Sequence, residues 1–181
     1  MKNNIVTMLG ASFTLLTVFA SCSKDDPELV EEQELITAVE LKFTSANTAA
    51  QTVRWTLDTN STPSIVLQSN TQYQVAVSFL DESDPADVED ITEEVKEEAD
   101  EHQVFYEFSG VSLDFSSADS DVLDSNNNPL YVNSVWNTNA SGSGTVRLYL
   151  IHEPLTKTSS NRSGFGGETD VEVDFTIVVQ E

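Results

Sequence analysis

The stretch Val171–Val179 reads VEVDFTIVV, with apolar and polar side chains alternating at period two. Successive side chains of a β-strand point to opposite faces, so this stretch offers one apolar face to a core. Its length and continuity predict a strand in the interior of a sheet rather than at an edge.

The same period-two pattern recurs along the chain. It is clearest at residues 39–43, 53–57, 73–79, 111–115 and 146–150, with shorter runs at 65–67, 104–108 and 130–136. Turn-forming clusters rich in Asn, Ser, Pro and Gly separate these runs. Many short strands with such turns predict an all-β, antiparallel, immunoglobulin-like sandwich, with a closed barrel as the alternative.

One acid-rich segment, residues 81–101, departs from this pattern. Ile91, Val95, Ala99 and His102 are spaced as one apolar stripe of a helix. We expect Asp90 to cap a short acidic helix, with Glu93 completing a capping box. The stripe must pack on the sheet, because the acidic residues on the other faces repel one another.

The first 26 residues have the features of a lipoprotein export signal. Lys2 gives a positive start, the run from Ile5 to Ala20 is apolar, and small residues precede Cys22. The apolar run is shorter than the roughly 20 residues that span a bilayer, and the pattern is typical of a secretory signal. We therefore expect removal of residues 1–21, lipidation of Cys22, and an acidic tether at 22–34 before a β-sandwich domain at 35–181.

The net charge and the cysteine content limit which classes of molecule the protein can bind and how its cysteine is used. The chain has 31 acidic and 8 basic residues, a net charge of −23, and a single cysteine. Nucleic acid is excluded as a partner because phosphate binding needs a basic face. The charge favours solubility, cationic partners or weakly held divalent ions. One cysteine forms no internal disulfide, which fits lipid attachment at Cys22.

A metal site is one interpretation of the polar residues. The candidate ligands are nitrogen and oxygen donors from three segments: His102, His152, Glu98, Glu153, Glu168 and Asp170. Zinc, or another divalent cation, accepts such ligands if the fold brings the segments together. We favour structural roles instead, with His102 at a helix C-terminus and His152 pairing with a carboxylate to seal a strand end.

The sequence supports a calcium-binding loop or an enzyme active site less well than it supports the metal site above. Asp119, Asp121, Asp124, Asn126 and Asn128 offer oxygen ligands, but the glycine and glutamate of an EF-hand loop are missing at the required positions. This segment therefore predicts a polar hairpin turn. The sequence contains none of the nucleophile-elbow, phosphate-loop or HExxH motifs. We expect no enzyme, with a carboxylate-dependent hydrolase as a remote alternative.

Several blocks carry a family resemblance. Residues 79–82, 90–95, 97–103, 105–106, 152–154 and 166–173 resemble small Bacteroidetes outer-membrane lipoproteins, often labelled "type 1 periplasmic binding fold superfamily protein". That label denotes two α/β lobes, whereas the strand pattern here predicts an all-β domain. The segment Ser23–Asp26 resembles the surface-export signal of such lipoproteins.

The resemblance implies a location but no activity. We expect a lipid-anchored protein of the outer membrane, exposed at the cell surface, that acts as a non-enzymatic binding or transporter-accessory module. Its expected partners are the bilayer through acylated Cys22, and an outer-membrane transporter or a small ligand. Zinc binding through His102 and His152 is the alternative function.

Overall fold

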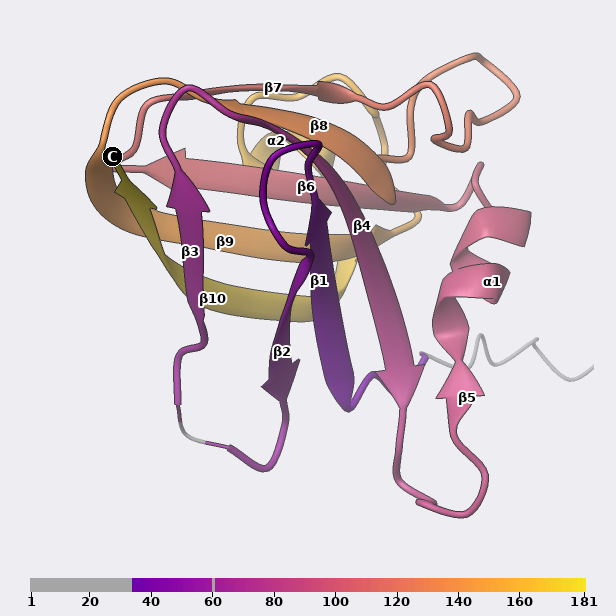
Figure 1. Ribbon diagram of the computed structural model, residues 1–181. Helices are drawn as coiled ribbons and strands as arrows, with labels where there is room; N and C mark the ends of the chain where they lie inside the picture. Colours follow the sequence, from indigo (N-terminus) through magenta and orange to yellow (C-terminus); the bar gives the residue numbers. More distant parts are fainter. Residues whose placement is uncertain (1–33, 60) are drawn as a thin grey trace, which may run out of the picture. The chain divides into compact units, whose positions relative to one another are not determined.

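The computed structural model describes residues 34–59 and 61–181. The predicted signal peptide (1–21), Cys22 and the predicted tether up to residue 33 lie outside the described residues. The described residues form two facing β-sheets with a shared apolar core (Figure 1). This arrangement confirms the all-β sandwich and contains no closed barrel among the described strands.

The first sheet is antiparallel throughout. Its strands, in spatial order, are β2 (Gln51–Thr56), β1 (Ala38–Thr44), β4 (Gln72–Asp81), β8 (Asn133–Thr138) and β7 (Leu113–Ser117). The two-residue strand β5 (Glu89–Asp90) pairs with the end of β4.

The second sheet contains one parallel pair. Its order is β3 (Ser64–Gln68), β10 (Glu168–Gln180), β9 (Gly142–His152) and β6 (His102–Ser109). Strand β10 runs parallel to β3 and antiparallel to β9. The period-two run at 171–179 therefore lies in the interior of the sheet, as its length and continuity predicted.

The core is built from the inward-facing residues of both sheets. Strand β10 alternates buried and exposed side chains along almost its whole length. Trp136 is fully buried, donates its indole N–H to Ser134 Oγ at 3.0 Å, and meets the rings of Phe43 and Phe108 edge-to-face. Trp55 is partly buried against the same core. Both tryptophans thus serve packing, which is the usual role of large aromatic side chains.

Three of the predicted strand runs extend beyond the strands of the structure. In the run at 53–57, Leu57 follows the end of β2 and is 60% exposed. Val111 precedes β7, which begins at Leu113. In the predicted run at 130–136, Leu130 and Val132 are buried but lie before β8. Apolar periodicity reports which side chains are buried, and irregular backbone can bury the same side chains as a strand.

The acidic helix is shorter than the sequence predicted. Helix α1 (Ile91–Glu97) is capped by Asp90, whose side chain accepts the Thr92 N–H at 3.1 Å. Glu93 pairs with Lys96 at 2.8 Å instead of completing a capping box. The prediction of His102 at the helix end was wrong, because His102 is the first residue of β6.

Helix α1 is hydrogen-bonded to β4 just beyond the point where the pairing of β4 with β8 ends. Strand β8 pairs with β4 only as far as Ala76. Beyond it, the hydroxyl of Thr92 accepts the Phe79 N–H at 2.8 Å and lies 3.3 Å from the Phe79 carbonyl oxygen. Thr92 is 2% exposed. Figure 1 shows α1 beside β4 and β5, and this side chain takes the place of a strand partner.

We expect Thr92→Val to lower the free energy of unfolding by about 1–3 kcal/mol, because it keeps the shape but leaves a buried N–H without an acceptor. Urea unfolding followed by circular dichroism measures the change. Thr52→Val, at an exposed threonine of β2, is the matched control. Equal stability of the two variants would contradict the role assigned to the Thr92 hydroxyl.

Candidate metal centre

Strand pairing aligns the two histidines at one end of the second sheet. His102 of β6 lies opposite His152 of β9, which lies opposite Glu168 of β10. The imidazole rings of His102 and His152 stack with centroids 5.0 Å apart and planes 9° apart. Two residues far apart in the sequence thus become neighbours through sheet register alone.

His102 is the buried centre of this cluster, with a side chain 1% exposed. Its Nδ1 lies 3.3 Å from the backbone carbonyl oxygen of Glu98, just after helix α1. Its Nε2 lies 3.3 Å from Oε1 of Glu34, whose side chain is 12% exposed. The helix end therefore fixes the ring orientation, and the other nitrogen points at a carboxylate.

What the contact between Nε2 and Glu34 requires depends on which nitrogen of His102 carries the proton. When Nδ1–H donates to the Glu98 carbonyl, a neutral imidazole presents a lone pair at Nε2. That lone pair would face the lone pairs of the Glu34 carboxylate across 3.3 Å. A proton on Nε2, or a metal ion bound to both atoms, converts this repulsion into attraction.

The distance fits a metal as well as a proton. Zinc–nitrogen bonds of about 2.0–2.1 Å and zinc–oxygen bonds of about 2.0–2.2 Å, at a tetrahedral angle, place the two ligand atoms about 3.3–3.5 Å apart. The observed separation is 3.3 Å. An N–H donated to a backbone carbonyl is also the usual way in which a metal-binding histidine is oriented.

Glu98 is a third candidate ligand. One ligand atom from each of Glu34, Glu98 and His102 lies within 4.8 Å of the others. The Glu98 side chain is 46% exposed, so it can rotate toward the other two without disturbing the core. Within residues 34–59 and 61–181, this is the single group of histidine, cysteine and carboxylate side chains that converges in this way.

The charges around the cluster agree with a cation site. Burial lowers the pKa of His102, but the hydrogen bond and charge of Glu34, the Glu98 carbonyl and the charge of Asp170 together outweigh burial, so the pKa rises above its ordinary value. Burial, together with the charges of Glu34 and Glu98, raises the pKa of Glu94. Carboxylates are thus crowded here, and a bound cation would relieve their repulsion.

The other predicted ligands occupy different positions. His152 covers one face of the His102 ring. Glu153 has a positive φ of 46° and donates its N–H to the Glu101 carbonyl at 2.7 Å. Glu168 is exposed, and Asp170 lies at a bulge of β10, where its charge also raises the pKa of His102. The converging group contains His102 and Glu98 from the predicted set.

Glu34 is the ligand that sequence reasoning missed. It belongs to the predicted tether, because acidic residues and Pro27 precede it without an apolar period. Its only signal is the neighbouring pair Leu35 and Ile36, of which Ile36 is buried. The structure places this last residue of the predicted tether directly against His102.

A buried lysine fixes the backbone beneath the cluster. Lys157 donates to the carbonyl oxygens of Ala99 and His102, the latter at 2.6 Å, and lies 3.8 Å from Asp124. Burial lowers the pKa of Lys157, an effect opposed by the charges of Asp124 and Asp100. The contacts join the helix end, the start of β6 and the loop after β9.

The segment considered for calcium is a polar turn. Oδ1 of Asp124 accepts the N–H groups of Asn126 and Asn128, at 2.8 and 2.7 Å. Asp121 accepts the N–H groups of Tyr131 and Asn133. These carboxylates thus satisfy backbone donors of their own loop.

Comparisons of the chain with protein families, curated proteins and solved structures gave no match. The described helices are too short and too polar to cross a membrane.

We expect Glu34→Gln to lower the pKa of His102, because burial persists while the hydrogen bond and charge of the Glu34 carboxylate are lost. NMR titration of the imidazole signals measures it, with His152→Asn to assign the two histidines. Glu97→Gln, on the exposed side of α1, is the matched control. An unchanged His102 pKa in Glu34→Gln would refute the pairing.

The same pairing has a consequence for stability. Because folding raises the pKa of His102, its contribution is complete below the unfolded pKa of about 6.5 and is lost as the pH rises through the folded value. We expect the stability difference between the wild type and Glu34→Gln to shrink across that interval, in urea titrations at successive pH values. A stability difference between the wild type and Glu34→Gln that increases with pH would contradict a raised pKa of His102 in the folded protein.

Proposed function

We propose that the protein is a lipid-anchored, non-enzymatic binding module whose ligand at the Glu34–Glu98–His102 cluster is a divalent cation, with zinc the best match. The observation that carries the proposal is the approach of His102 Nε2 to Glu34 Oε1 at 3.3 Å, two atoms that are both acceptors when neutral His102 carries its proton on Nδ1. An imidazole and carboxylates are suitable zinc ligands.

Several features support a metal rather than a proton alone. The second oxygen of Glu34, Oε2, is buried without a hydrogen bond to any described residue. Glu98 supplies a further carboxylate within 4.8 Å. Three protein ligands leave one tetrahedral position for water or a partner's side chain. The net charge of −23 raises the local concentration of cations around the whole chain.

Location is the second part of the proposal. The apolar run before Cys22, and the small residues that precede it, support acylation of this cysteine after export. Residue 34 would then connect the metal cluster to the membrane through the predicted tether at 22–34. The proposal thus joins a binding site to an anchor separated from it by a short stretch of chain.

We expect zinc at about 100 times its Kd to stabilise the wild type by about 2.7 kcal/mol, a rise in Tm of roughly 5–10 °C. Differential scanning fluorimetry with and without zinc measures it. Glu34→Gln, Glu98→Gln and His102→Asn should each remove most of the shift, while Glu97→Gln should keep it.

Two results would decide against this ligand set. A zinc shift that persists in both Glu34→Gln and Glu98→Gln, whose side chains can change without opening the core, would exclude the cluster. Loss of the shift in His152→Asn with retention in Glu98→Gln would assign the ligands to the two histidines. Isothermal titration at pH values below the His102 pKa should show weaker binding, because protons compete for Nε2.

We expect Cys22→Ser to move the protein from the membrane fraction to the soluble fraction of cells that produce it. Intact mass spectrometry of the wild type should show loss of residues 1–21 and gain of acyl chains at Cys22. Ser23→Ala is the matched control and should remain in the membrane fraction. An unmodified Cys22 thiol in the wild type would end this part of the proposal.

A further inference from the structure

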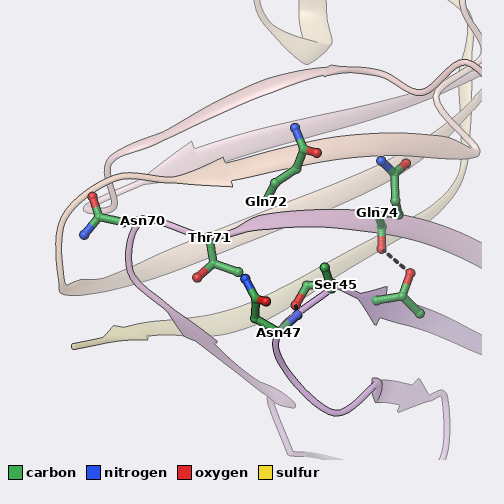
Figure 2. A pocket seen from close by; sticks show the side chains of 8 residues that line it. Ser45, Asn47, Asn70, Thr71, Gln72 and Gln74 are labelled. Carbon is green, nitrogen blue, oxygen red and sulfur yellow. Dashed lines mark hydrogen bonds between the residues drawn. The ribbon is translucent and has the colours of Figure 1, made fainter.

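A hollow of about 420 Å³ lies on the outer side of the first sheet. It is formed by the loop that follows β1 and by the first residues of β4. Gln72 and Gln74 are outward-facing, since their neighbours Tyr73 and Val75 are buried. The labelled lining residues in Figure 2 are Ser45, Asn47, Asn70, Thr71, Gln72 and Gln74.

The wall made by β4 is fixed by a buried hydroxyl. Thr138, which is 2% exposed, accepts the Thr71 N–H at 3.1 Å, and its Oγ1 lies within hydrogen-bond distance of the carbonyl oxygens of Gln68 and Thr71. Asn70 has a positive φ of 50° and donates its N–H to the Asn139 carbonyl. The turn before β4 is thus held in one conformation.

The opposite wall holds itself together. Ser45 Oγ accepts the N–H groups of Asn47 and Thr48 and lies 2.8 Å from Thr48 Oγ1. Thr44 donates its hydroxyl to the Gln74 carbonyl at 3.4 Å, which links the two walls. These hydrogen bonds hold the walls in place before any ligand binds. A preformed hollow avoids the entropic cost of ordering the loop when a ligand binds.

Two of the residues that line the hollow carry side-chain amides without a hydrogen-bond partner among the described residues. Those of Asn47 and Gln74 make no hydrogen bond to any described residue. Figure 2 shows the Asn47 amide turned toward Thr71, while Gln72 and Gln74 project from the same side of β4. Gln72 is oriented by the bond from its Nε2 to Asn137 Oδ1, at 3.1 Å. Each amide offers both a donor and an acceptor.

The lining excludes several classes of ligand. The chain has 31 acidic residues, yet this hollow is lined by neither an acidic nor a basic side chain. A metal ion would find no charged ligand here, and an anion would meet no cation and a net charge of −23. Aromatic side chains are also absent from the lining. Uncharged ligands with many hydroxyl groups match paired amide donors and acceptors.

We propose that this hollow binds a neutral saccharide through the amides of Asn47, Gln72 and Gln74. Its volume lies in the range of small-molecule sites, roughly 300–1,000 Å³. A second hollow of about 220 Å³ shares Thr44 and Gln74 with it and is also lined by Asn133 and by Lys42, so the uncharged lining is a property of the first hollow alone. The site therefore extends past one sugar unit, which favours an oligosaccharide chain over a free monosaccharide.

The experiment uses ¹⁵N-labelled protein titrated with glucose, with neutral glucose and mannose oligosaccharides, and with sialic acid. We expect the side-chain amide signals of Asn47 and Gln74 to shift with the neutral sugars at millimolar concentration, and at least tenfold tighter binding of a trisaccharide than of glucose. Sialic acid should produce no shift at these positions. Gln74→Ala should weaken the trisaccharide at least tenfold.

Gln180→Ala, at an exposed amide of β10, is the matched control and should bind as the wild type does. Failure of every neutral sugar to shift the Asn47 and Gln74 amides would overturn the proposal. Equal affinity for glucose and the trisaccharide would assign the site to free sugars. An equal response to sialic acid would refute selectivity for neutral ligands. None of these outcomes depends on zinc.

Discussion

The rest of the structure depends on the burial of one face of β10 in the core between the two sheets. Within its own sheet, β10 lies between β3 and β9. The strand is thirteen residues long, and a shift of one residue would turn its apolar side chains to solvent. The register of β9, and through it of β6, follows from this strand. The stacking of His102 on His152 is therefore a consequence of core packing, and a candidate metal ligand is positioned by residues outside the candidate site.

The sequence predicted the β-sandwich because alternation of apolar and polar residues indicates which side chains a strand buries. It was less accurate for irregular segments such as Leu130 and Val132, which are buried without being in a strand. Arg162–Phe165 forms a short helix, α2, within a loop whose serines and glycines gave no helical period. Its buried Phe165 packs on Phe105.

The candidate metal centre was only half visible in the sequence. His102 and Glu98 were both among the predicted ligands, but His102 was expected at the end of a helix that in fact ends at Glu97. The turn that follows still brings the Glu98 carbonyl to the His102 ring. The sequence could not identify Glu34 as a candidate ligand. Its contact with His102 joins two distant segments, and no pattern of apolar and polar residues relates them. Such contacts depend on where the chain enters the fold, and local patterns do not encode that.

The place of Glu34 in the chain has a mechanical consequence. Tension applied through the amino-terminal residues enters the described structure at Glu34, four residues before β1 begins. The link between Glu34 and His102 would then carry force before any strand pair does. Occupancy by a cation would strengthen that link, so metal supply or acidity would set how much tension the amino-terminal segment withstands before it separates from the sheet.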